Sequence, residues 1–177
     1  MKIRNMSRCA MLTVLLAVCA WISIPLGDRT VSMQTLGLFM ALALLGGKLG
    51  TVTVGVYLLL GAAGVPVFAG FRGGIDVLLG PTGGYLWGFF AAGVLYWILE
   101  RRLPDWVNMG LGLLICYGCG TVWYYFAYGS GALWPVVMTC VVPYLLPDLI
   151  KILLAVVLSR RLKKLVDQKS SEQGAKE

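Results

Sequence analysis

The sequence predicts an all-helical integral membrane protein, and three observations support this prediction. Apolar residues make up 59% of the 177 residues and charged residues only 13%, and the mean hydropathy is +0.82. So few charges cannot cover the surface of a water-soluble domain of this size. The apolar stretches are long enough for membrane-spanning helices of about 20 residues, and they lack the alternating pattern of a membrane β-barrel.

Six apolar segments are predicted to span the membrane as helices. They cover residues 9–26, 31–45, 49–64, 83–99, 107–128 and 132–158. The second and third are short for a bilayer about 30 Å thick, and only Gly46-Gly47-Lys48 separates them. A five-span arrangement therefore stays open. We expect residues 1–160 to form one transmembrane domain and residues 161–177 to form a basic, disordered cytoplasmic tail.

The positions of the basic residues predict the orientation of the chain. In the six-span arrangement one side carries Lys48, Arg101, Arg102 and the basic residues of both termini, whereas the other carries only Arg29 and Arg72. The positive-inside rule then places both termini in the cytoplasm. This rule also accounts for the net charge of +7. We expect no nucleic-acid partner, because the charges lie beside a membrane exit and no binding module accompanies them.

The cysteines and the first apolar segment have alternative interpretations. Leu16-Ala17-Val18-Cys19 is close to a lipoprotein cleavage site, but Val18 stands where Gly or Ala is expected. Five more apolar segments follow, so we favour an uncleaved first helix. Cys116-Tyr117-Gly118-Cys119 has the spacing of half a metal or redox site. The sequence has five cysteines and no histidine. We therefore expect no metal and no cofactor, and interpret the cysteines as small residues between packed helices.

Residues 65–85 are predicted to form a structured loop rather than a spanning helix. They include two prolines and six glycines, which stop helices and let backbones approach closely. Irregular apolar backbone is tolerated near a bilayer only where protein or a water-filled cavity covers it. We expect the loop to fold over the helix bundle from the outer side. A plain extracellular turn is the alternative, but it would have little use for the apolar residues Val67, Phe68, Phe71, Ile75, Val77, Leu78 and Leu79.

One acid and one base, Asp148 and Lys151, lie in the otherwise apolar stretch 132–158. Ionisable side chains at membrane depth are costly and are usually functional. Pro147 suits the first turn of a helix, so a helix is predicted to restart there with both side chains on one face, toward the bundle. Two interpretations stay open. The residues form a structural ion pair, or they bind a polar ligand at the bottom of a cavity that is open to the outside.

Several motifs together resemble those of the BioY family. They are Val65-Pro-Val-Phe-Ala-Gly70, Gly73-Gly74, Leu78-Leu-Gly-Pro-Thr-Gly-Gly-Tyr85 and Pro147-Asp-Leu-Ile-Lys151, with Ile24-Pro25-Leu26 and Met33-Gln34-Thr35-Leu36-Gly37 around the first loop. Members of that family are biotin-binding substrate-specificity (S) components of energy-coupling factor (ECF) transporters. The resemblance covers most of the chain. It implies a six-helix protein of the prokaryotic cytoplasmic membrane, without ATPase activity of its own.

The resemblance implies biotin as the ligand and an ECF module as the partner. That module has a transmembrane coupling subunit and two cytoplasmic ATPases, which drive release of the vitamin inward. Asp148 and Lys151 match the family's polar contacts to biotin. We expect Phe68, Phe71 and Tyr85 to supply apolar walls, as small-ligand pockets usually require.

The resemblance also suggests where the coupling subunit docks. S components resemble one another in small residues spaced by four on the first helix, and Cys9, Thr13 and Ala17 occupy that spacing. Packing within the bundle is the alternative interpretation.

Arg72 and Asp76 place charges in a loop that the family usually fills with Gly and small polar residues. They could pair with each other or adjust the loop over the site.

Three other functions stay open on the sequence. A stand-alone biotin facilitator would support uptake without a coupling subunit. A small membrane enzyme would use Asp148 and Lys151 as acid and base, although no histidine, metal cluster or nucleophile accompanies them. A purely structural subunit would bind no ligand and would tolerate Asp148→Asn.

Overall fold

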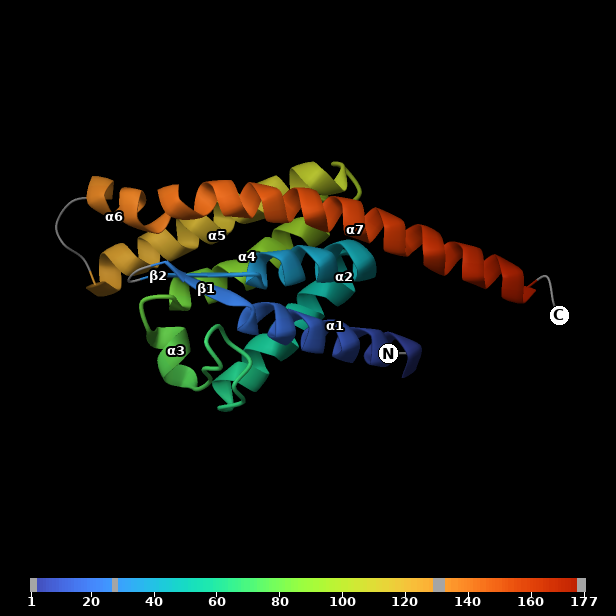
Figure 1. Cartoon of the computed structure of the whole chain (residues 1–177), viewed down its shortest axis with the longest axis horizontal. Helices are drawn as coiled ribbons and strands as arrows, with labels where there is room; N and C mark the ends of the chain where they lie inside the picture. The colour runs from blue at the N-terminus through green and yellow to red at the C-terminus, as the bar shows by residue number, and fades with distance from the viewer. Residues whose placement is uncertain (1–2, 27–28, 129–132, 175–177) are drawn as a thin grey trace.

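The computed structural model describes residues 3–26, 29–128 and 133–174, and helices dominate them (Figure 1). The helices are α1 (Ile3–Trp21), α2 (Gln34–Ala62), α3 (Ile75–Leu79), α4 (Gly83–Leu99), α5 (Asp105–Tyr128), α6 (Leu133–Cys140) and α7 (Val142–Gly174). An antiparallel hairpin of β1 (Ser23–Leu26) and β2 (Arg29–Ser32) connects α1 to α2. The predicted all-helical class is confirmed, and this short hairpin is an addition to it.

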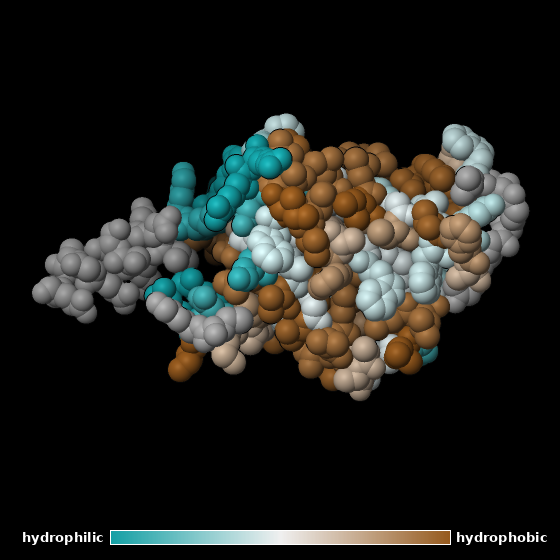
Figure 2. Space-filling view, turned by 180° about the vertical axis from the view of Figure 1, so that it is seen from behind, coloured by the Kyte–Doolittle hydropathy of each residue, from teal (hydrophilic) through white to brown (hydrophobic). Residues whose placement is uncertain are grey.

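The surface of the bundle is apolar over most of its length. Within the described residues four helices, α1, α2, α5 and α7, are long and apolar enough to cross a membrane, and α4 is a shorter apolar helix. Figure 2 shows apolar side chains over the middle of one face, with hydrophilic side chains gathered toward the end from which α7 projects. Exposed apolar side chains such as Leu146 (72% exposed) need lipid around them. The chain is a multi-pass membrane protein.

Helix α2 reverses its direction at Gly46. This residue has φ +78° and ψ 168°, a conformation that glycine adopts without steric cost. The two parts of α2 run back alongside each other, because Gly50 packs closely on the backbone of Leu42 and the Gln34 side chain donates a hydrogen bond to the Tyr57 hydroxyl. These two parts correspond to the segments 31–45 and 49–64 expected from the sequence.

The second part of α2 begins against the end of α4. The Gly47 N–H donates to the carboxylate of Glu100, which satisfies one of the N–H groups that a helix start leaves free. A Cβ atom at position 47 would lie 2.2 Å from the Cα of Trp97. The backbones of α2 and α4 therefore meet at a distance that only glycine allows.

The last predicted span, 132–158, is divided between α6 and α7, which meet at Val141. The expectation that a helix restarts at Pro147 is wrong, because α7 begins at Val142 and Pro147 lies inside it. Pro143 is the proline that occupies the first turn, where its missing N–H costs nothing. At its other end α7 continues to Gly174.

Different helices and strands lie at the two ends of the bundle. The first residues of α1 and the last residues of α7 lie toward one end, and the β1–β2 hairpin, α3 and α6 lie toward the other (Figure 1). Between them the core is closely packed, with fully buried side chains contributed by several helices, including Leu16, Leu38, Phe39, Val54, Tyr57 and Met109. The candidate site lies in the half of the bundle that carries the hairpin and α3.

We expect Gly47→Ala to destabilise the protein, because the added methyl group would overlap the Trp97 backbone. Such overpacking costs roughly 1–3 kcal/mol. Gly118→Ala in α5 is the matched control, since nothing lies within 4 Å of the added atom. Thermal unfolding in detergent measures both variants. Equal melting temperatures for the two would contradict the close α2–α4 contact.

Candidate ligand-binding site

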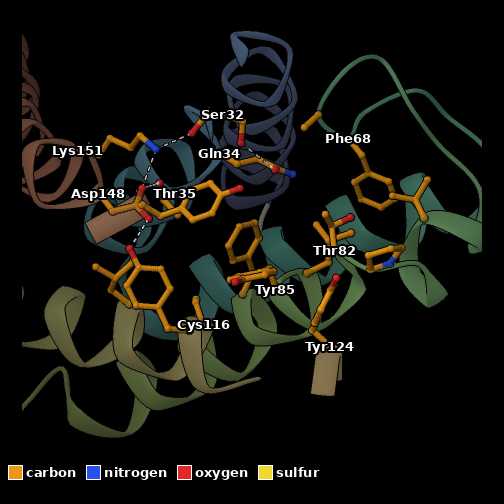
Figure 3. A pocket seen from close by; sticks show the side chains of 18 of the residues that line it. Ser32, Gln34, Thr35, Phe68, Thr82, Tyr85, Cys116, Tyr124, Asp148 and Lys151 are labelled. Carbon is orange, nitrogen blue, oxygen red and sulfur yellow. Dashed lines mark hydrogen bonds and ion pairs between the residues drawn. The ribbon is translucent and has the colours of Figure 1, made fainter. Parts of the chain in front are cut away.

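A cavity of about 540 Å³ lies inside the bundle. This volume is in the range of about 300–1,000 Å³ that small-ligand sites occupy. Figure 3 shows Asp148, Lys151 and Thr35 close together, with Phe68 across the cavity from them. The lining combines β2, α2, α4, α5, α7 and the loop between α2 and α4, and consists of Ser32, Gln34, Thr35, Phe68, Ala69, Arg72, Val77, Pro81, Thr82, Tyr85, Leu86, Phe89, Leu113, Cys116, Tyr117, Tyr124, Tyr144, Asp148 and Lys151.

Asp148 and Lys151 form a buried ion pair in the wall of this cavity. Lys151 Nζ lies 2.7 Å from Asp148 Oδ1, and each residue is only 4% exposed. Their spacing of three residues puts both side chains on one face of α7, as the sequence predicts. Lys151 Nζ also donates to the backbone carbonyl of Ser32 at 2.7 Å, which ties α7 to the end of the hairpin.

The Asp148 carboxylate is held by two further donors from other helices. The Thr35 hydroxyl, in the first turn of α2, donates to Oδ1 at 2.9 Å, and the Tyr117 hydroxyl of α5 donates to Oδ2 at 2.8 Å. A carboxylate away from water needs such partners, because burial of an unpaired charge is very unfavourable. The carboxylate thus joins α2, α5 and α7 at one point.

The ion pair retains hydrogen-bonding capacity for a ligand. Within the described residues Asp148 accepts three hydrogen bonds and Lys151 donates two, whereas a carboxylate offers about four acceptor sites and an ammonium three donors. The pair carries no net charge. It can therefore bind a neutral polar group that has both donors and acceptors without burying an uncompensated charge.

A second set of hydrogen bonds fixes the loop between α2 and α4, residues 63–82. Gln34 Nε2 donates to the Tyr57 hydroxyl at 2.6 Å, and that hydroxyl donates to the carbonyl of Val67 at 2.9 Å. The ring of Phe68 meets the ring of Tyr57 edge-on, with centroids 5.5 Å apart, and packs directly over Gly61. These contacts hold Phe68 against the cavity.

Of the three aromatic residues expected in the wall, Phe68 and Tyr85 line the cavity and Phe71 does not. Phe71 is 64% exposed and stacks on Trp21 of α1, with ring centroids 5.0 Å apart. The expectation for Phe71 is therefore corrected. The reason is a tight turn, in which Phe71 has φ +57° and the backbone reverses between Phe68 and Arg72.

The small residues Cys9, Thr13 and Ala17 are all buried, and α1 packs mainly against α2. Cys9 Sγ lies 3.8 Å from the carbonyl of Leu49 in α2, within reach of a weak hydrogen bond. Thr13 donates to the Cys9 carbonyl. In this structure these three small residues serve packing of α1 within the bundle. This was the alternative interpretation of their spacing.

Sequence reasoning missed the residues that hold the ion pair. Thr35 and Tyr117 are distant from Asp148 in sequence, and Tyr117 stands in the Cys116–Cys119 segment that we interpreted as packing. Tyr124 and Tyr144 also line the cavity. The sequence did carry a signal for these residues, because each has a polar side chain inside an apolar helical segment, where that side chain needs a hydrogen-bond partner.

The fold and the cavity define a class: a small helical membrane protein with a buried polar pair in a ligand-sized cavity. The model of the BioY family matches residues 1–168, and the chain belongs to this family. It is 38% identical to "Biotin transporter BioY" of Thermotoga maritima over 92% of this chain and 97% of that protein, and 36% identical to "Probable biotin transporter BioY" of Pyrococcus horikoshii over 92% and 98%.

Solved structures agree with this membership. The chain superimposes on the crystal structure of an S-component for biotin from an ECF-type ABC transporter with a TM-score of 0.83, at 28% identity and 92% coverage of both chains. A second S component of a bacterial ECF transporter matches with a TM-score of 0.57 at 16% identity, which shows the shared fold alone.

We expect Asp148→Asn to destabilise the protein more than the combination of Asp148→Asn with Lys151→Met. The single variant leaves the Lys151 ammonium buried without its counter-charge, which costs about 3 kcal/mol or more. The double variant has no charge there, and the amide oxygen introduced at position 148 would still accept a hydrogen bond from Thr35 or Tyr117. Thermal unfolding without ligand compares them. A double variant less stable than the single one would indicate that the pair is primarily a structural lock.

Proposed function

We propose that this chain is the biotin-binding S component of an ECF-type transporter and that it captures biotin for uptake across the cytoplasmic membrane. Its family membership, its relatives named as biotin transporters and its similarity to a biotin S-component support this function. The observation that carries the proposal is the buried, neutral Asp148–Lys151 pair in the wall of a cavity of about 540 Å³.

The chemistry of the cavity suits biotin. The vitamin has a ureido group with N–H donors and a carbonyl acceptor, an apolar bicyclic body and a carboxylate on an alkyl chain. Asp148 can accept from N–H groups, and Lys151 can donate to a carbonyl or a carboxylate. The rings of Phe68, Tyr85 and Phe89 supply the apolar surface that the bicyclic body needs. No bond of the ligand is made or broken in this function.

We infer that the chain crosses the membrane six times, with both termini in the cytoplasm. The segments are α1, the two parts of α2, α4, α5 and the α6–α7 pair. The Gly46 reversal lies at the end of the bundle where α1 begins, because Cys9 Sγ of α1 lies 3.8 Å from the Leu49 carbonyl. The later part of α7 lies toward the same end, because Gly47 contacts Glu100 and Asp105 pairs with Lys163 of α7 at 3.4 Å. Lys48, Arg101 and Arg102 adjoin this end, which the positive-inside rule assigns to the cytoplasm. The cavity then lies in the outer half.

The proposal requires partners that supply energy, namely a transmembrane coupling subunit and two cytoplasmic ATPases. We assign docking to α1, whose outward face carries the exposed side chains Met11 and Val14. Cys9, Thr13 and Ala17 then support docking indirectly, because their small size lets α1 lie close to α2.

Purified wild-type protein in detergent is expected to bind biotin, and Asp148→Asn and Lys151→Ala should each weaken binding at least tenfold, about 1.4 kcal/mol. Leu146→Ala is the matched control, because Leu146 lies on the same helix but is 72% exposed. Equilibrium binding after size-exclusion chromatography measures this on folded protein only. If folded wild-type protein binds no biotin, the proposed function is wrong.

Reconstitution in vesicles tests the proposed partners. Biotin should accumulate only when the coupling subunit, both ATPases and ATP are present, because the chain has no nucleotide-binding motif of its own. Asp148→Asn should reduce this accumulation. Biotin uptake by the chain alone at the same rate would identify a stand-alone facilitator instead.

A further inference from the structure

Three charged side chains of the described part of the chain line the cavity, and their charges do not sum to zero. They are Asp148, Lys151 and Arg72. Because Asp148 and Lys151 neutralise each other, Arg72 leaves the cavity with one surplus positive charge. The ion pairs found among the described residues are Asp148–Lys151 and Asp105–Lys163, and neither includes Arg72. A cavity of this kind favours a ligand with a single negative charge.

The turn that contains Arg72 directs its side chain over the cavity. The N–H of Phe68 donates to the carbonyl of Arg72 at 2.9 Å, and the two residues form an antiparallel bridge. Residues directly opposite each other in such a bridge present their side chains on the same face. Figure 3 shows the Phe68 ring at the cavity, and Arg72 lines the same cavity.

The other face of this turn is fixed to α1. Phe71 stacks on Trp21, and the indole Nε1 of Trp21 donates to the carbonyl of Pro66 at 2.8 Å. Gly70 and Phe71 both have positive φ, 71° and 57°, which reverses the chain within the turn. A bulky residue rarely adopts this conformation, so the contacts with Trp21 are needed to maintain it. The position of Arg72 is therefore built into the loop.

Arg72 and the ion pair lie at different depths. Arg72 is exposed to solvent as well as lining the cavity, so it lies at the rim, whereas Asp148 and Lys151 are buried. A ligand carboxylate beside the ion pair would add a net negative charge to a buried site and would meet Asp148, so it would be disfavoured there. At the rim a carboxylate keeps part of its hydration and can form two parallel hydrogen bonds with a guanidinium.

We propose that Arg72 binds the carboxylate of the ligand and thereby sets its orientation, with the neutral ureido group of biotin at Asp148 and Lys151. This assignment rests on the proposed function. It makes Arg72 a specificity-determining residue that selects for an anionic ligand. The apolar body of the ligand then lies between the two polar contacts, against the aromatic lining.

The test compares biotin with biotinamide, in which a neutral amide replaces the carboxylate. Wild-type protein should prefer biotin, and added salt should reduce this preference because the contact is near the surface. Arg72→Gln should weaken biotin binding about tenfold and leave biotinamide binding unchanged within about twofold. Arg72→Lys should retain part of the preference, since an ammonium keeps the charge but not the bidentate geometry.

Two further variants separate this assignment from its rivals. Asp76→Asn should behave as wild type, whereas an equal effect of Asp76→Asn and Arg72→Gln would mean that these residues act as a pair in the loop. The Asp148→Asn/Lys151→Met double variant, which removes both charges of the pair and keeps the surplus charge of Arg72, should weaken both ligands alike. If it abolishes the preference for biotin instead, the carboxylate binds at Lys151 and the proposed orientation is reversed.

The outcomes distinguish this inference from the proposed function. Equal weakening of both ligands by Arg72→Gln, or no weakening of either, overturns the role of Arg72 while biotin binding by wild-type protein still stands. Failure of folded wild-type protein to bind biotin overturns the proposed function itself, and the Arg72 assignment with it.

Discussion

The arrangement of the helices depends on one constraint, which is that Asp148 and Lys151 are charged and lie inside an apolar bundle. Such a pair is tolerated only when its remaining polar atoms also find partners. Thr35, Tyr117 and the carbonyl of Ser32 supply them from α2, α5 and the hairpin. Three segments must therefore converge on α7 at one depth. Their convergence leaves the space that forms the cavity.

The same constraint connects the ion pair to the loop that covers the cavity. Lys151 donates to the backbone of Ser32, whose hydroxyl donates to Gln34 Oε1 at 3.2 Å, and Gln34 in turn donates to Tyr57. Tyr57 donates to the carbonyl of Val67, the residue before Phe68. A continuous series of hydrogen bonds thus runs from the buried pair to the loop. Binding of a ligand at the pair and the position of the loop are physically linked through these four side chains.

Composition and local spacing predicted the class of protein and the central pair, because both are properties of short segments. Asp148 and Lys151 stand out as the only charges in 132–158, and a three-residue spacing determines that they share a face. The partners of Asp148 could not be predicted in this way. Thr35 is 113 residues away in the chain, and the contact exists only because α2 and α7 pack together. Phe71 was misplaced for a related reason, since two consecutive residues with positive φ, Gly70 and Phe71, reverse the chain and decide which side of the turn the ring faces.

The central claim is that the Asp148–Lys151 pair and its cavity form the ligand-binding site. A crystal structure of the protein with biotin tests it most directly. The account predicts biotin inside the cavity, with a polar atom of the vitamin within hydrogen-bond distance of Asp148 or Lys151, about 2.7–3.2 Å, and its bicyclic body beside Phe68 and Tyr85. Biotin bound elsewhere, with the ion pair and its partners unchanged and the cavity unoccupied, would contradict it.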